Sequence, residues 1–143
     1  MTDILEIQAT LHAYRDFSEC IVTGIVLENF GTTVKVLLDY IWNADGTVKG
    51  ESDESIEVTL TFRLLQDLDI RNRLGPENLV DPSSINWSHS EVALVEVRAD
   101  ERSQVYDSAD IPFFHCTLWW EQHPWIEIIA ASLDFAESQS TRI

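Results

Sequence analysis

The segment from Phe113 to Trp125 contains the side chains best suited to chemistry in this sequence, namely His115, Cys116, Glu121 and His123. A cysteine close to a histidine can act as a nucleophile with its base. Neighbouring residues of a strand point to opposite faces, however, so His115 and Cys116 cannot form this pair with each other. Cys116 has the parity of the apolar residues around it, which predicts a small core residue.

The histidines and the glutamate of this segment are also potential metal ligands, because imidazole and carboxylate groups bind zinc. His115 and Glu121 have the same parity but lie six residues apart, or ~20 Å along an extended strand. They meet only if the strand bends, and His12 or His89 would have to join them from elsewhere. We expect no cofactor and no metal, and His115, Glu121 and His123 are the weak candidates for one.

A second polar segment follows the Asn43–Gly46 turn. Its acidic residues are Asp45, Glu51, Asp53, Glu54 and Glu57. No apolar setting separates the pKa values of these carboxyl groups, so acid–base catalysis is not indicated. One interpretation is a solvated loop. The other is a surface that binds a basic protein, with Trp42 as an aromatic anchor.

Trp119 and Trp120 are neighbours, so one of them faces the core of the domain and the other faces away. If Trp120 faces the core, Trp119 and Phe113 lie on the second face, where aromatic residues can bind a partner or stack on a sugar. We favour the alternative, in which the N-terminal helix or a second sheet covers this face.

The 25 acidic and 9 basic residues give the chain a net charge of −16. This charge repels nucleic acids and anionic membranes and attracts basic proteins, although it also promotes solubility. The sequence has no phosphate-binding glycine loop, no nucleophile elbow and no zinc-binding helix motif. An enzyme is therefore not favoured.

Cys20 and Cys116 are the only cysteines, and no Cys-x-x-Cys pair suggests a zinc site. The N-terminus lacks a basic and then apolar leader. No apolar run reaches the ~18 residues that span a membrane. We expect a cytoplasmic protein with free thiols.

Alternation of apolar and polar residues is clearest from Ser55 to Leu64. The predicted apolar face of this strand is formed by Ile56, Val58, Leu60, Phe62 and Leu64. Further strands are predicted at Cys20–Glu28, Thr33–Trp42, Val92–Arg98, Pro112–Glu121 and Trp125–Phe135, the last with a bend at Ala130–Ala131.

A helix is predicted between Asp3 and Phe17, with an extended segment as the alternative. The apolar positions of the helix are Ile4, Leu5, Ile7, Leu11 and Tyr14. Gln66–Ser90 is irregular, and Asp100–Asp110 is a polar turn. The length fits one domain over residues 1–143. The predicted class is mainly β (α+β), as a curled antiparallel sheet or a small β-sandwich with one N-terminal helix.

Several stretches of the sequence carry a resemblance: Phe17-Ser-Glu-Cys-Ile-Val-Thr-Gly-Ile, Val34-Lys-Val-Leu-Leu-Asp, Val58-Thr-Leu-Thr-Phe-Arg-Leu-Leu-Gln-Asp-Leu, Trp125-Ile-Glu-Ile and Leu133-Asp-Phe. They resemble small uncharacterised bacterial domains that open with Phe-His-Asp-Ala and a strand of alternating leucines. Several such domains are assigned as immunity proteins of bacterial toxin systems. Ser18 and Glu19 stand where those domains have His and Asp, so no functional residue is transferred.

Three functions follow as hypotheses. The first is a non-enzymatic acidic binding protein, an immunity-like inhibitor of a basic bacterial toxin. The second is a ligand-binding or enzymatic domain with a pocket near His115, Glu121 and His123. The third is a structural module that forms a homodimer through a sheet face or an edge strand.

Overall fold

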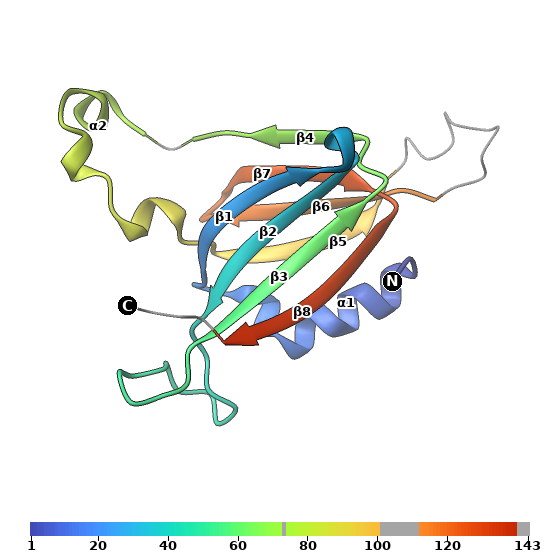
Figure 1. Cartoon of the computed structure of the whole chain (residues 1–143), viewed down its shortest axis with the longest axis horizontal. Coiled ribbons are helices and arrows are strands. Elements are labelled where there is room, and N and C mark those ends of the chain that lie inside the picture. The colour runs from blue at the N-terminus through green and yellow to red at the C-terminus, as the bar shows by residue number, and fades with distance from the viewer. Residues whose placement is uncertain (73, 101–111, 140–143) are drawn as a thin grey trace.

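The computed structural model describes residues 1–72, 74–100 and 112–139, and within them eight antiparallel strands form two sheets (Figure 1). The first sheet has the order β1–β2–β3–β8 and the second the order β4–β7–β6–β5. The predicted class, mainly β with one N-terminal helix, is confirmed, although six strands were expected. The strands are β1 (Ile21–Glu28), β2 (Thr33–Tyr40), β3 (Ile56–Arg63), β4 (Asp67–Ile70), β5 (Leu94–Ala99), β6 (Phe114–Trp120), β7 (His123–Ala130) and β8 (Ser132–Gln139).

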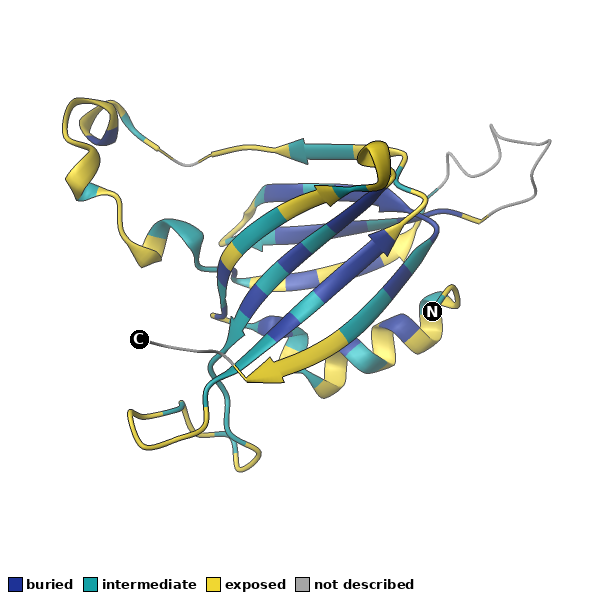
Figure 2. Ribbon diagram, viewed as in Figure 1, coloured by how far each residue is buried: buried dark blue, intermediate teal, exposed yellow. Residues whose placement is uncertain are grey.

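Strand β3 lies inside its sheet between β2 and β8, and its alternating sequence supplies the core. Val58, Leu60 and Phe62 are fully buried, as predicted. The ring of Phe62 lies 6.3 Å from that of Phe114 on the facing sheet. Figure 2 shows that buried positions alternate with more accessible ones along most of β2. This alternation places one face of each sheet against the other.

The chain changes sheet at two places. After β3, Leu64 adopts a φ of 53° and its side chain is 51% exposed. The prediction that Leu64 continues the apolar face is therefore wrong, because the strand ends at Arg63 and the chain turns toward β4. Between β7 and β8, the N–H of Ala131 donates to the carbonyl of Arg63 at 3.1 Å. The predicted bend is confirmed here, and it separates two strands of different sheets.

The hairpins of the first sheet follow the local sequence signals. Strands β2 and β3 pair from Thr33 opposite Arg63 to Tyr40 opposite Ile56, and they form a long hairpin. The register between β1 and β2 shifts between Val22 and Gly24, which leaves Thr23 as a β-bulge.

Helix α1 (Ile4–Ala13) begins after Asp3, whose side chain accepts a hydrogen bond from the Leu5 N–H. Ile7 and Leu11 are buried, but Leu5 is 75% exposed, contrary to the prediction. The helix ends before Phe17 because a 3₁₀ turn with positive φ angles occupies Arg15–Phe17.

Helix α1 runs along the side of the sandwich where β5 and β8 form the sheet edges (Figure 1). The side-chain amide of Gln8 donates to the carbonyl of Val97 in β5 at 2.8 Å. At the other edge, the N–H of Leu133 in β8 donates to the carbonyl of Met1 at 2.9 Å. The helix thus closes one side of the sandwich. In the described part of the chain, no helix is long and apolar enough to span a membrane.

The segment predicted as irregular contains a strand and an arm. Asp67–Ile70 forms strand β4 beside β7, so the prediction that Gln66–Ser90 is irregular is wrong for these four residues. Residues 74–90 then leave the sheets as an arm that holds α2 (Pro76–Val80) and 3₁₀ turns at Pro82–Ser84 and Trp87–Ser90 (Figure 1). The predicted polar turn at Asp100–Asp110 lies almost wholly outside the described residues.

Candidate functional site

The loop that joins β2 to β3, here called the acidic loop (residues 43–54), carries most of the predicted binding residues. Its first half is a turn in which the Gly46 N–H donates to the Asn43 carbonyl at 3.0 Å. Gly46 has a φ of 90°, which glycine adopts without strain. The Asp45 carboxylate accepts hydrogen bonds from the N–H and the hydroxyl of Thr47, at 3.0 and 2.6 Å.

The second half of the acidic loop is organised by Asp53. Its Oδ2 accepts a hydrogen bond from the Gly50 N–H at 2.7 Å and another from Nδ2 of Asn43 at 3.1 Å. The pKa of Asp53 is lowered mainly by the Gly50 hydrogen bond, and that of Asp45 mainly by the Thr47 hydroxyl. Both carboxylates therefore stay ionised to a lower pH than an ordinary aspartate.

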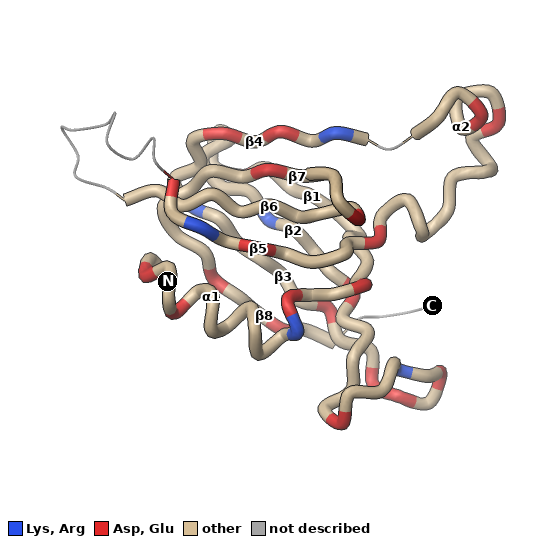
Figure 3. Tube along the Cα trace, turned by 180° about the vertical axis from the view of Figure 1, so that it is seen from behind, with Lys and Arg blue, Asp and Glu red and all other residues tan. Residues whose placement is uncertain are grey.

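The predicted acidic residues form a solvent-facing group. Asp45, Glu51, Asp53 and Glu54 are exposed, whereas Glu57 is half-buried in β3. Figure 3 shows the loop as red segments with a single blue one, which corresponds to Lys49. The loop therefore presents a mostly negative surface at one end of the molecule.

Trp42 lies at the base of the acidic loop and is half-buried. Its indole N–H donates to the carbonyl of Ser18 at 2.7 Å, and the guanidinium of Arg15 lies 5.5 Å from the centre of its ring. These contacts tie the loop to the turn that follows α1. Part of the Trp42 ring already makes contacts within the protein, so its role as an aromatic anchor for a partner remains a prediction.

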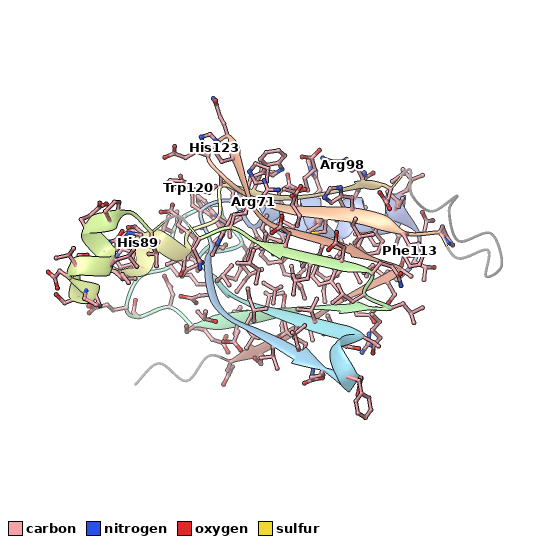
Figure 4. All side chains as sticks on the ribbon, turned by 90° about the horizontal axis from the view of Figure 1, so that it is seen from above. Arg71, His89, Arg98, Phe113, Trp120 and His123 are labelled. Atoms are coloured by element: carbon pink, nitrogen blue, oxygen red, sulfur yellow. The ribbon has the colours of Figure 1, made fainter. Side chains whose placement is uncertain are left out.

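Trp119 lies on the outer face of the second sheet, where its indole N–H donates to Glu96 at 3.0 Å. Helix α1 lies beside the β5 edge, so the prediction that this helix covers the outer face is wrong (Figure 1). Phe113 is buried with Ile129 and Ala131 in a small separate cluster. Figure 4 shows Phe113 and Trp120 near opposite ends of β6.

The three residues of the predicted pocket do not converge. In the β6–β7 register, His115 pairs with Ile129, whereas His123 pairs with Trp120 at the other end of the hairpin. Glu121 lies in the turn between the two strands. Within residues 1–72, 74–100 and 112–139, no group of three His, Cys, Asp or Glu side chains is placed to hold a metal ion.

His115 instead belongs to a polar network that crosses the outer face of the second sheet. A guanidinium can only donate, so Nδ1 of His115 accepts from Arg98 at 3.2 Å and the ring proton lies on Nε2. Nε2 is 3.3 Å from Glu127, an ion-pair distance rather than an aligned hydrogen bond. Arg71 joins Glu127 to Asp69, at 3.3 and 3.1 Å.

Sequence reasoning missed Arg71 and Glu127, because the pairing of β4 with β7 has no local sequence signal. Figure 4 shows Arg71 and Arg98 on the same side of the second sheet. Each member of the network has an oppositely charged or polar neighbour. The network therefore favours a structural role.

Both thiols are buried and unpaired. Burial raises the pKa of Cys20 to about 11 and also raises that of Cys116. A buried protonated thiol is a poor nucleophile, so the predicted core role of Cys116 is confirmed.

Two adjoining cavities lie where the arm meets the β6–β7 turn, with volumes of about 280 and 310 Å³. Their shared lining residues are Ser88, Glu91, Trp120 and Glu121. Of the three residues expected at a pocket, Glu121 lines both cavities, whereas His115 and His123 line neither. His89, on the arm, lines the second cavity.

The fold is an antiparallel β-sandwich with one helix closing a side. No family model matches the chain, and no curated protein is significantly similar to it. Among solved structures, an uncharacterized protein from Neisseria gonorrhoeae has a similar fold, with a TM-score of 0.51 and 9% sequence identity. The match covers 82% of this chain and 90% of that chain. At such identity the likeness concerns the fold alone.

Proposed function

We propose that this protein is a non-enzymatic acidic binding protein that docks onto a basic protein, as an immunity-like inhibitor of a basic bacterial toxin. The observation that carries the proposal is the acidic loop. It exposes Asp45, Glu51, Asp53 and Glu54 within one short segment. The net charge of −16 gives the whole molecule the same sign.

The acidic loop is suited to binding because its own hydrogen bonds order it before a partner arrives. Asn43 bonds both Thr47 and Asp53, so the two halves of the loop are held together. Ordering a loop in advance lowers the entropy cost of association. The lowered pKa values of Asp45 and Asp53 keep both carboxylates charged to a lower pH than an ordinary aspartate.

The sign of the charge selects the class of partner. Negative potential accelerates encounter with basic surfaces and opposes approach to phosphate backbones and anionic lipids. The second hypothesis, a pocket shared by His115, Glu121 and His123, has lost its geometric basis. Binding to a basic protein is thus the function that the described surface supports best.

The test begins with capture of partners from cells of the source organism on the immobilised protein, followed by association kinetics with the purified captured protein. We expect a basic protein whose association rate falls with added salt. The double variant Glu51→Gln/Glu54→Gln should slow association by roughly 3- to 10-fold. The matched control Glu6→Gln/Glu77→Gln removes the same charge elsewhere and should change the rate much less.

An inhibitory role adds a growth readout. Expression of the captured protein alone should be toxic, and co-expression of this chain should restore growth. The proposal would be overturned by a captured partner that is acidic. It would also be overturned by an association rate that changes neither with added salt nor in the Glu51→Gln/Glu54→Gln variant. Growth that is not restored would leave a binding protein but remove the immunity-like role.

A further inference from the structure

Strand β1 is an edge of the first sheet, and the outer side of its backbone can pair with another strand. In the part of the chain that the structure describes, β1 pairs along its length with β2 alone. On its other side it forms one isolated bridge, between Ile21 and Glu91. The β1 edge beyond that bridge is therefore open to strand addition (Figure 1).

Three apolar side chains toward the end of this edge are exposed. Val26 is 43% exposed, Leu27 56% and Phe30, at the hairpin tip, 108%. Leu27 lies opposite Val34, which is fully buried, so the two side chains are on the same face of the sheet, the one that faces the core. Leu27 nevertheless remains accessible to solvent. The nearest edge of the second sheet is β4, a strand of four residues, which is too short to cover it.

The charge pattern indicates which strand would pair here. Between Ile21 and Phe30 the one charged residue is Glu28, and it is paired with Lys35 at 3.2 Å. The edge is therefore nearly neutral on a molecule of net charge −16. It offers little to a basic partner, and it lacks the lysines and prolines that commonly protect an edge strand. An apolar strand with little charge of its own fits best, and a second copy of this chain presents one.

We propose that two copies of this chain associate through β1, joining their first sheets edge to edge. The bulge at Thr23 interrupts the regular edge, so the paired segment is Gly24–Glu28 in antiparallel orientation, centred on Val26. In this arrangement the two Glu28 residues lie ~13 Å apart along the strands. That separation exceeds the screening length of ~8 Å at physiological salt. This dimer does not depend on the proposed binding of a basic protein.

A cysteine cross-link tests the arrangement directly. At the centre of the antiparallel pair the two Val26 side chains are direct neighbours, within disulfide reach. Val26→Cys should form a covalent dimer under mild oxidation. Val48→Cys is the matched control, because Val48 is 58% exposed but lies on the acidic loop. We expect cross-linking roughly 10-fold faster for Val26→Cys. Cys20 and Cys116 are buried and do not compete.

Light scattering supplies an independent readout. The wild-type protein should show a dimer whose population rises with concentration and with salt, because salt screens the repulsion between two acidic copies. Binding to a basic protein has the opposite salt dependence, so the two proposals fail separately. Leu27→Lys, checked for folding by circular dichroism, should be monomeric. A wild-type monomer at millimolar concentration, or equal cross-linking of the two cysteine variants, would overturn the dimer.

Discussion

The two sides of this sandwich, where the edges of the two sheets face each other, differ in how they are covered. On the side of β5 and β8, helix α1 fills the gap, and Ile7 and Leu11 are 0% and 2% exposed. On the side of β1 and β4, the described residues include no helix over the gap (Figure 1). Leu27 and Ile70 remain accessible there. Apolar surface on the first side stabilises the monomer, whereas on the second it is available for association.

The largest expected effect on the free energy of unfolding comes from removing a buried side chain of α1, the helix that covers one side of the sandwich. Leu11→Ala should lower the free energy of unfolding by about 2–5 kcal/mol, because it removes a buried side chain and leaves a cavity between α1 and the sheets. Leu5→Ala makes the same change on the 75% exposed face of the same helix and should cost less than ~0.5 kcal/mol. Urea unfolding of both variants measures the difference. Equal losses would mean that α1 is not the cover of this side.

The local parts of this architecture could be predicted from sequence. The alternation of Val58, Leu60 and Phe62 needs only the period of a strand, and the buried positions Ile7 and Leu11 need only the period of a helix. Leu64 was misassigned because periodicity does not show where a strand stops. The side that α1 covers could not be predicted either, because it depends on the order of strands in two sheets.

The candidate site also has one part that could be predicted from sequence and one part that could not. The acidic loop could be located because Asn43, Asp45 and Gly46 are turn residues that act through neighbours in sequence. The His115 network could not, since Glu127 and Arg98 reach His115 from the strands on either side. A histidine near a glutamate in sequence suggested Glu121, but register placed Glu127 beside it instead.

An intermediate effect on the free energy of unfolding is expected at the contact between the N-terminus and β8, on the side of the sandwich that α1 covers. The Met1 ammonium lies 2.7 Å from the Asp134 carboxylate of β8, which also pairs with Arg63. The hydrogen bond from that ammonium is the main reason that the pKa of Asp134 is lowered. Because the side chain is 49% exposed, Asp134→Asn should cost only about 0.5–1 kcal/mol at pH 7.

The pH dependence of this cost has a definite sign. A carboxyl group whose pKa is lower in the folded state stabilises the protein above its unfolded pKa of ~4, and this stabilisation is lost as pH falls through the folded pKa. The difference in unfolding free energy between wild type and Asp134→Asn should therefore shrink from pH 7 to pH 3. Glu51→Gln, in the acidic loop, is the control. A difference that grows on acidification would exclude this contact as its source.

The smallest expected effect comes from the open side. Leu27→Ala removes the same atoms as Leu11→Ala, but Leu27 is 56% exposed, so in the monomer the loss should be within ~0.5 kcal/mol. If β1 pairs two copies, the wild-type melting temperature rises with protein concentration, whereas that of Leu27→Ala does not. Calorimetry across a range of concentrations separates the two contributions. A loss in the dilute monomer as large as that of Leu11→Ala would mean that both sides of the sandwich are closed.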